Sequence, residues 1–306
     1  MAPVERIPYD EFSMFHENAE EFGLPYPSPP TVRRESVEVE PGRRLSALVW
    51  GDGDPELVLL HGGAQNAHTW DTVALALDRP LVAIDLPGHG HSDGPRGGFT
   101  EVSGHARDVA AAVRALAPMA RVVVGMSLGG MTALALAGQD PELVRSLVLV
   151  DVTPGVDERK AASITAFISG PESFASFDEI LARTVEFNPT RTVPSLRRGI
   201  LHNAQQREDG SWVWRYARHR ADTSGQDSGG TRHPDFTTLW DIVSGLTVPL
   251  MLVRGMLPQS VVDDADEAEL LRRCPGARVE HVEGAGHSVQ GDKPVELATL
   301  IADFVR

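Results

Sequence analysis

A serine with glycines two residues away on each side gives the most specific chemical signal in the sequence, at residues 125–129 (GMSLG). The apolar run Val122–Val124 precedes it, and the run Met131–Ala137, which is typical of a helix, follows it. A serine on a strained turn from strand to helix needs such small neighbours, because a Cβ there would collide with the turning backbone. The turn holds the Ser127 hydroxyl above the sheet edge, near the positive end of the next helix. The pattern predicts a nucleophilic serine.

A nucleophilic serine needs a general base, and His287 is the histidine best placed for that role. It follows the apolar run Val279–Val282, in a loop of small residues at 283–288 (EGAGHS). Small neighbours let the imidazole ring approach a serine hydroxyl closely. His281 lies inside the run itself, so we interpret it as a structural or surface residue. We therefore predict His287 as the base.

Cleavage of an ester also needs N–H donors for the oxyanion, each contributing about 3 kcal/mol to transition-state stabilisation. The backbone N–H of Leu128, directly after the serine, is one candidate. The second is expected in residues 61–64 (HGGA), which follow the apolar run Leu57–Leu60 and have little side chain to block a substrate. We predict Gly63 as this donor, with Ala64 as the next choice.

The surrounding elements follow the pattern of an α/β fold. Short apolar runs alternate with segments of helical period, which predicts a mainly parallel sheet covered on both faces. Residues 36–40 and 45–50 alternate polar and apolar side chains, as an antiparallel pair at a sheet edge does. Helices are predicted over residues 102–116 and 295–305. The buried strands are predicted at Leu57–Leu60, Leu81–Ile84, Val122–Val124, Leu147–Val150, Leu250–Val253 and Val279–Val282.

The α/β pattern is interrupted in the middle of the chain. Residues 153–245 show no clean strand signal and collect aromatic side chains, so we predict a mainly helical lid there. The aromatic residues either line a substrate pocket or form the core of the lid itself. Within the lid, Ala221–Gly230 (ADTSGQDSGG) is predicted to be a mobile loop. The core domain then comprises residues 36–152 and 246–306, and residues 1–35, rich in proline, are predicted to be an extended arm.

Four motifs taken together resemble the α/β-hydrolase superfamily. They are HGG after a strand, residues 85–93 (DLPGHGHSD), GMSLGG at residues 125–130 and GAGH at residues 284–287, in that order. The resemblance covers nearly the whole chain apart from the arm and the insertion. It implies a twisted, mainly parallel sheet flanked by helices and a triad of serine, histidine and an acid.

The acid of the triad departs from the usual pattern. In most of the superfamily it stands three residues after a glycine that follows the strand corresponding to Leu250–Val253; here that glycine is Gly255, and the position holds Pro258. Some small esterases of the superfamily, and similarly haloalkane dehalogenases, carry the acid after the preceding strand, where this chain has Asp151. We predict Asp151. Asp263 or Asp264 remains an alternative, although both stand where helix-capping acids belong.

Residues 89–93 (HGHSD) match the H-x-H-x-D core of hydrolases that bind two metal ions. The next residue is Gly94, where that family carries another histidine. In α/β-hydrolases this loop is structural, and the resemblance implies that Asp85 orients the turn. We therefore predict neither a metal ion nor a cofactor.

Composition limits the partners of the chain. The 306 residues include 28 Lys+Arg and 43 Asp+Glu, a formal net charge of −15, which disfavours nucleic acid and anionic membranes. Cys274 is the single cysteine, so neither an intrachain disulfide nor a multi-thiolate metal site can form. No apolar leader or run of about 20 apolar residues is present, which favours a cytoplasmic protein. A homo-oligomer stays open.

These residues predict a serine hydrolase that cleaves a small carboxylic ester or a lactone through an acyl-enzyme. A serine at position 127 argues against epoxide hydrolases and dehalogenases, which need a carboxylate nucleophile at that point. Three alternatives share the triad: a C–C hydrolase of vinylogous diketones, a perhydrolase, and a ligand receptor of the same fold.

Overall fold

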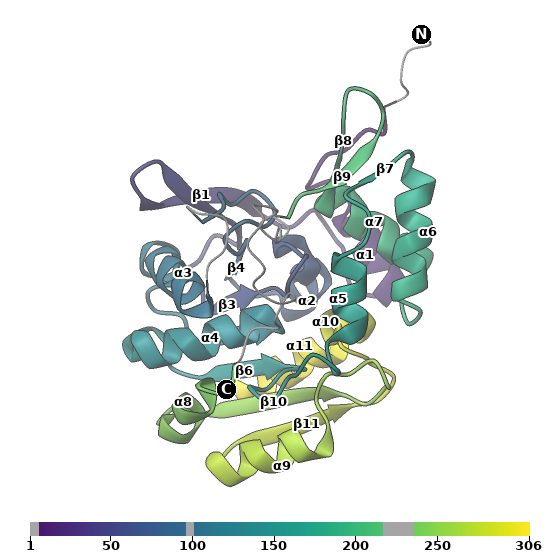
Figure 1. The fold of residues 1–306 in the computed structure, drawn as a ribbon. Coiled ribbons are helices and arrows are strands. Elements are labelled where there is room, and N and C mark those ends of the chain that lie inside the picture. Colours follow the sequence, from purple (N-terminus) through teal and green to yellow (C-terminus); the bar gives the residue numbers. More distant parts are fainter. Residues whose placement is uncertain (1–5, 96–100, 217–235) are drawn as a thin grey trace.

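An eight-stranded sheet forms the centre of the molecule, in a computed structural model that describes residues 6–95, 101–216 and 236–306 (Figure 1). The strand order is β1-β2-β4-β3-β5-β6-β10-β11. The first two strands and β4 pair antiparallel, and the other neighbours pair parallel. The strands are β1 (Val32–Glu40), β2 (Arg43–Trp50), β3 (Leu57–Leu60), β4 (Leu81–Ile84), β5 (Val122–Met126), β6 (Leu147–Val150), β10 (Leu250–Gly255) and β11 (Arg278–Val282). The predicted strands are confirmed, with small changes at their ends.

The apolar character of the central strands follows from their position. Every residue of β3, β4, β5 and β6 is buried, because helices cover both faces of the parallel part of the sheet. At the edge, β1 alternates between partly buried and exposed residues, as its sequence predicts. These strands provide a rigid base from which loops at one end can present chemical groups.

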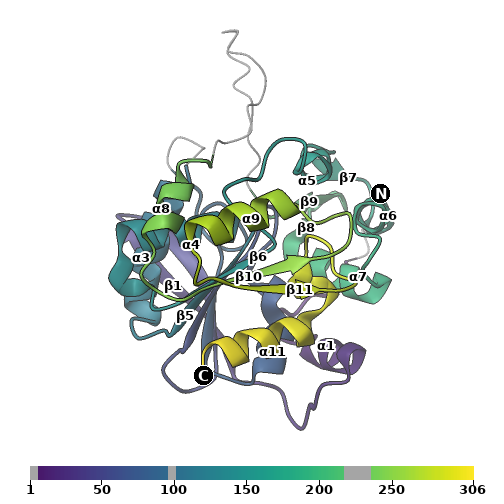
Figure 2. The same ribbon diagram turned by 90° about the horizontal axis from the view of Figure 1, so that it is seen from below.

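Helices pack on both faces of the sheet, and Figure 2 shows α9 and α11 on opposite sides of β10 and β11. One apolar core forms with α3, α4, α8 and α9, and a second with α1, α2 and α11. The helices of this part are α1 (Phe15–Phe22), α2 (Asp71–Leu77), α3 (Val102–Leu116), α4 (Leu128–Gln139), α8 (Leu239–Gly245), α9 (Asp264–Arg273), α10 (Val289–Asp292) and α11 (Pro294–Phe304), with 3₁₀ turns η1 (Ala67–Trp70) and η2 (Pro141–Leu143).

A cap stands between β6 and α8 and differs in one respect from the predicted mainly helical lid. Besides α5 (Ala162–Ile168), α6 (Phe177–Phe187) and α7 (Val193–Asn203), it has a small antiparallel sheet of β7 (Ser173–Phe174), β9 (Trp212–Trp214) and β8 (Ala204–Gln206). Strands of two or three residues are too short to give a periodic signal. Helix α8 also falls inside the predicted insertion, but Trp240 and Val243 pack in the main core. The predicted mobile loop Ala221–Gly230 lies outside the described residues.

The N-terminal segment is more ordered than the predicted extended arm. Its helix α1 places Phe15 against Trp50, with ring centroids 4.8 Å apart. The preceding Met14 belongs to the apolar core of the cap. This segment therefore connects the cap to the sheet domain. Among the described residues, no helix has both the length and the apolar character needed to cross a membrane.

Candidate active site

Ser127 occupies a strained turn between β5 and α4. Its backbone has φ 51° and ψ −119°, a left-handed conformation that costs free energy for a residue with a side chain. The flanking glycines are required by space: a Cβ on Gly125 would lie 2.4 Å from the Gly129 carbonyl oxygen, and one on Gly129 would lie 2.3 Å from that of Leu60. The turn has the geometry that the GMSLG spacing predicts.

We expect Gly125→Ala to destabilise the fold by roughly 1–3 kcal/mol or more, because its Cβ would meet backbone atoms that cannot move independently. Urea denaturation measures the loss. Gly245→Ala is the matched control. Gly245 lies in helix α8, and a Cβ added to it would meet open space. Equal stability of the two variants would contradict this account of the turn.

His287 and Asp151 form a hydrogen-bonded pair at the ends of their strands. The imidazole Nδ1 lies 2.8 Å from Asp151 Oδ2, and the carboxylate side chain is fully buried. This contact places the proton on Nδ1 and leaves Nε2 of His287 able to accept a proton from a nucleophile. His281, in contrast, is exposed and contacts Glu267 at 2.8 Å, in agreement with a surface role.

Asp151 is held by three further donors, one from the last residue of β10 and two from the segment that follows it. Its Oδ1 accepts from the Gly255 N–H at 2.9 Å and the Ser260 hydroxyl at 2.6 Å, and its Oδ2 accepts from the Val261 N–H at 3.0 Å. In most of the superfamily this segment supplies the acid itself. Here it supplies donors that fix a carboxylate from the neighbouring strand, an arrangement that the sequence did not predict.

The alternative acids, Asp263 and Asp264, contact residues other than His287. Asp263 caps α9 by accepting from the Asp266 N–H at 3.0 Å, and it pairs with Lys160 at 3.0 Å. Asp264 pairs with Arg254 at 2.8 Å, and its side chain is 96% exposed. The structure therefore does not bring either of them to His287, and the capping role is the observed one.

The predicted oxyanion donors lie beside the serine turn. A Cβ on Gly62 would meet Met126 Sδ at 2.5 Å and Ser127 Cβ at 3.2 Å, so the HGG loop packs directly on the turn. The second choice, Ala64, uses its N–H to bind His89 Nε2 at 3.2 Å. Within the described part of the chain, no acceptor binds the N–H of Gly63 or Leu128. Both groups stay available for an oxyanion.

Ser127, His287 and Gly63 line one cavity of about 480 Å³ beneath the cap. The aromatic residues of the cap divide between the two roles that the sequence left open. Phe174 and Trp212 pack inside the cap. The aromatic residues of the described cap that line the cavity are Phe167, Phe187 and Trp214.

The HGHSD loop is structural, as expected from the resemblance. Both ring nitrogens of His89 contact backbone groups. Nδ1 lies 3.0 Å from the Pro87 carbonyl oxygen, and Nε2 accepts from the Ala64 N–H. Asp85 accepts from the N–H groups of His91 at 3.1 Å and Ala67 at 2.7 Å. It thereby orients the turn.

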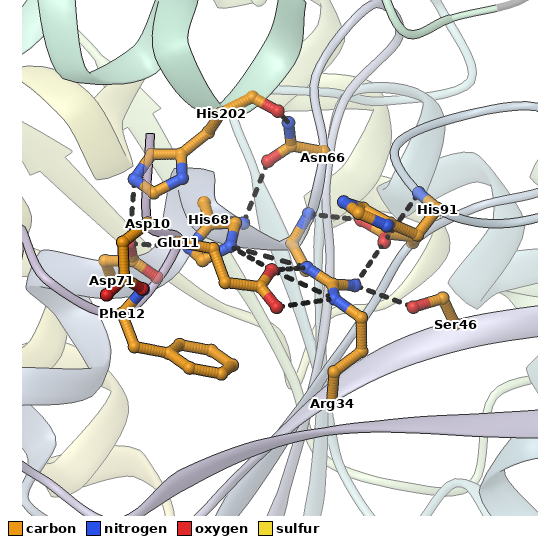
Figure 3. Close-up of polar contacts among 12 residues, drawn as sticks. Asp10, Glu11, Phe12, Arg34, Ser46, Asn66, His68, Asp71, His91 and His202 are labelled. Atoms are coloured by element: carbon orange, nitrogen blue, oxygen red, sulfur yellow. Dashed lines mark hydrogen bonds and ion pairs between the residues drawn. The ribbon is translucent and has the colours of Figure 1, made fainter. Parts of the chain in front are cut away.

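A buried charged cluster next to the cavity was not predicted (Figure 3). His68 contacts Asp71 through Nδ1 at 2.9 Å and Glu11 through Nε2 at 3.3 Å, and Arg34 binds Glu11 at 2.7 Å. Burial disfavours the charged imidazole, but the Asp71 and Glu11 carboxylates outweigh it and raise the pKa of His68 to about 9. The cluster therefore ties the N-terminal segment to the sheet domain by charge.

His202 of the cap completes this cluster. Its ring stacks on His68 with centroids 3.8 Å apart, and its Nδ1 bonds the Tyr9 hydroxyl at 2.8 Å. Burial and the positive charge of His68 hold the pKa of His202 well below its ordinary value. Ligand atoms of His68, Asp71 and His202 lie within 4.8 Å of one another, and in the described ranges they are the one group that could hold a metal ion. His68 and Asp71 stand three residues apart, but nothing in the sequence links them to His202.

The cluster predicts a pH dependence of stability. The unfolded pKa of histidine is about 6.5, so between pH 6.5 and 9 the folded chain keeps a proton on His68 that the unfolded chain releases. The free energy of unfolding should therefore fall as pH rises through this window. Below it, His61 and His202 stay neutral in the folded chain, which reduces stability as pH falls.

Urea denaturation at several pH values from 6 to 9.5 measures this dependence. In His68→Gln, the free energy of unfolding should fall much less above pH 6.5 than in the wild-type protein, whatever the absolute stability of the variant. An unchanged slope in that variant would contradict the assignment.

Comparisons with known proteins identify the family to which the fold belongs. A model of the alpha/beta hydrolase fold family matches residues 55–294. Esterase Rv0045c of Mycobacterium tuberculosis is 44% identical over 299 residues, covering 95% of this chain and 94% of that protein. The sn-1-specific diacylglycerol lipase ABHD11 of Xenopus laevis is 28% identical, covering 82% of this chain and 80% of that protein.

A crystal structure of Rv0045c superimposes with a TM-score of 0.83 at 43% identity, covering 98% of this chain and 99% of that one. The family match extends over most of the sheet domain and the cap. It confirms the predicted fold class and the resemblance seen in the four motifs. The chain therefore belongs to the alpha/beta hydrolase fold family.

Proposed function

We propose that the chain is a carboxylic ester hydrolase that works through Ser127, His287 and Asp151. The observation that carries the proposal is the 2.8 Å contact between His287 Nδ1 and a buried Asp151, beside a cavity that Ser127 also lines. The names of two relatives, an esterase and a diacylglycerol lipase, support an ester as the substrate class.

In the proposed mechanism, Ser127 Oγ attacks the ester carbonyl carbon while His287 Nε2 takes its proton. The carbonyl π electrons move to the oxygen, which the N–H groups of Gly63 and Leu128 stabilise. The C–O bond to the alcohol then breaks, His287 returns the proton to the leaving oxygen, and an acyl-enzyme remains. Water, deprotonated by His287, attacks the acyl carbon; the bond from this carbon to Ser127 Oγ breaks, His287 returns the proton to Oγ, and the acid leaves. Asp151 accepts the hydrogen bond from His287 Nδ1 and holds the imidazole in position.

A panel of substrates tests the proposal. We expect the highest kcat/KM for carboxylic esters as a class, with lactones tested as their cyclic counterparts. Vinylogous diketones and peracid formation from hydrogen peroxide test the C–C hydrolase and perhydrolase alternatives. Cleavage of diketones alone, or tight binding without turnover as in a receptor, would contradict an ester hydrolase.

A further inference from the structure

Among the described residues, Arg191 is a cation that lines the cavity and has no carboxylate partner. It lies in the connection between α6 and α7, and the same cavity is lined by Ser127 and His287. Its side chain donates to the Ser195 hydroxyl from Nε at 3.2 Å and from Nη2. In the part of the chain that the structure describes, no carboxylate lies within 4.0 Å of its guanidinium.

Two other cations that line the cavity, among the described residues, are paired with acids. Lys160 pairs with Asp266 at 2.6 Å and with Asp263 at 3.0 Å. Arg198 pairs with Glu21.

Arg159 is the remaining lysine or arginine of the cavity lining among the described residues. It lies 3.9 Å from Asp157, and its side chain is 78% exposed to water. Arg191 therefore differs from all three in having neither an acid nor full solvation to balance its charge.

The acid on α10, the helix against which Arg191 packs, has other partners. Asp292, at the end of α10, accepts from the Thr190 hydroxyl at 2.8 Å and from the Gly286 N–H at 2.8 Å. It therefore anchors the loop that carries His287. Burial lowers the pKa of the Arg191 guanidinium from its ordinary value, and the more distant Asp292 only partly opposes that shift.

Arg191 also lies close to the catalytic loop. Its guanidinium packs over the backbone of Gly291, where a Cβ would be 2.1 Å from Nη1. Gly291 stands in α10, four residues after His287. A group bound to the guanidinium from the cavity would lie in the space that Ser127 and His287 also line.

Arg191 is partly buried. A guanidinium partly removed from water without a counter-ion is unfavourable, whereas a fork of N–H donors binds a carboxylate strongly. We propose that Arg191 binds a free carboxylate of the substrate, so that the preferred substrates are half-esters of dicarboxylic acids. This inference rests on the proposed ester hydrolase activity and specifies its substrate class.

Paired substrates test the inference. The substrates are the monoethyl and diethyl esters of linear C4 to C7 dicarboxylic acids, which differ in one charge at equal chain length. The quantity measured for each is kcat/KM. We expect the wild-type protein to favour the monoester by about 10- to 100-fold per ester group at the best length, from a charge-assisted hydrogen bond. Arg191→Gln should remove this preference while the diester rates change less than about threefold, and Arg191→Lys should keep part of it.

Arg159→Gln is the matched control, because it also removes a cation that lines the cavity. It should keep the preference. The inference is overturned if the wild-type protein treats both esters alike, if Arg191→Gln slows both equally, or if Arg159→Gln abolishes the preference.

Binding separates this inference from the proposed activity. Titration calorimetry of the dicarboxylic acid monoesters against Ser127→Ala, with and without Arg191→Gln, needs no turnover. One outcome is selective binding that depends on Arg191 while the wild-type protein hydrolyses neither ester. It would support the carboxylate site and refute the ester hydrolase. Hydrolysis of diesters without selective binding would do the reverse.

Discussion

Replacing Ser127 by alanine should lower kcat for ester hydrolysis on the order of 10⁵-fold, because no other group at the turn can form the acyl-enzyme. The residual rate above water would come from the oxyanion donors and from substrate binding. The fold should remain, since the strained backbone of the turn is kept by the glycines around it rather than by the hydroxyl.

Initial rates on the best ester and a thermal unfolding scan, measured on the same preparation, check this expectation. A variant that unfolds at the wild-type temperature and has lost activity supports the role of Ser127. A folded variant with unchanged turnover would refute it.

Replacing Asp151 by asparagine should lower kcat by about 10⁴-fold, because the amide favours the wrong tautomer of His287. The change should also cost roughly 1–3 kcal/mol of stability. An amide group has one acceptor oxygen where the carboxylate has two, so some of the donors from Gly255, Ser260 and Val261 would lose their partner.

Asp263→Asn is the matched control for Asp151→Asn. Asparagine caps a helix about as well as aspartate, so stability and kcat should stay near those of the wild-type protein. The two variants should therefore separate by orders of magnitude in kcat at saturating substrate. Loss of activity in the Asp263 variant alone would show that the acid is misassigned.

The sheet could be predicted because its central strands are buried on both faces and hence read as continuous apolar runs. The serine turn could be predicted because its glycines are imposed by local backbone clashes within the turn and its neighbouring strand. The short strands of the cap could not, since two or three residues show no period.

Parts of the site that depend on distant residues gave no local signal. The donors from Ser260 and Val261 to Asp151 span more than 100 residues, and they explain how the segment that lacks the usual acid still takes part in the site. The stacking of His68 on His202 and the position of Arg191 in the cavity lining likewise arise only when the cap folds over the sheet domain.

Covalent labelling followed by peptide mapping tests the central claim most directly. A fluorophosphonate loses fluoride when a serine oxygen activated by a histidine attacks its phosphorus, and the adduct is stable to mass spectrometry. We predict one label per chain, on Ser127, with activity falling in proportion and no label in Ser127→Ala or, at the same exposure, in His287→Ala. A label on another residue, or hydrolysis that continues in a fully labelled protein, would contradict the account.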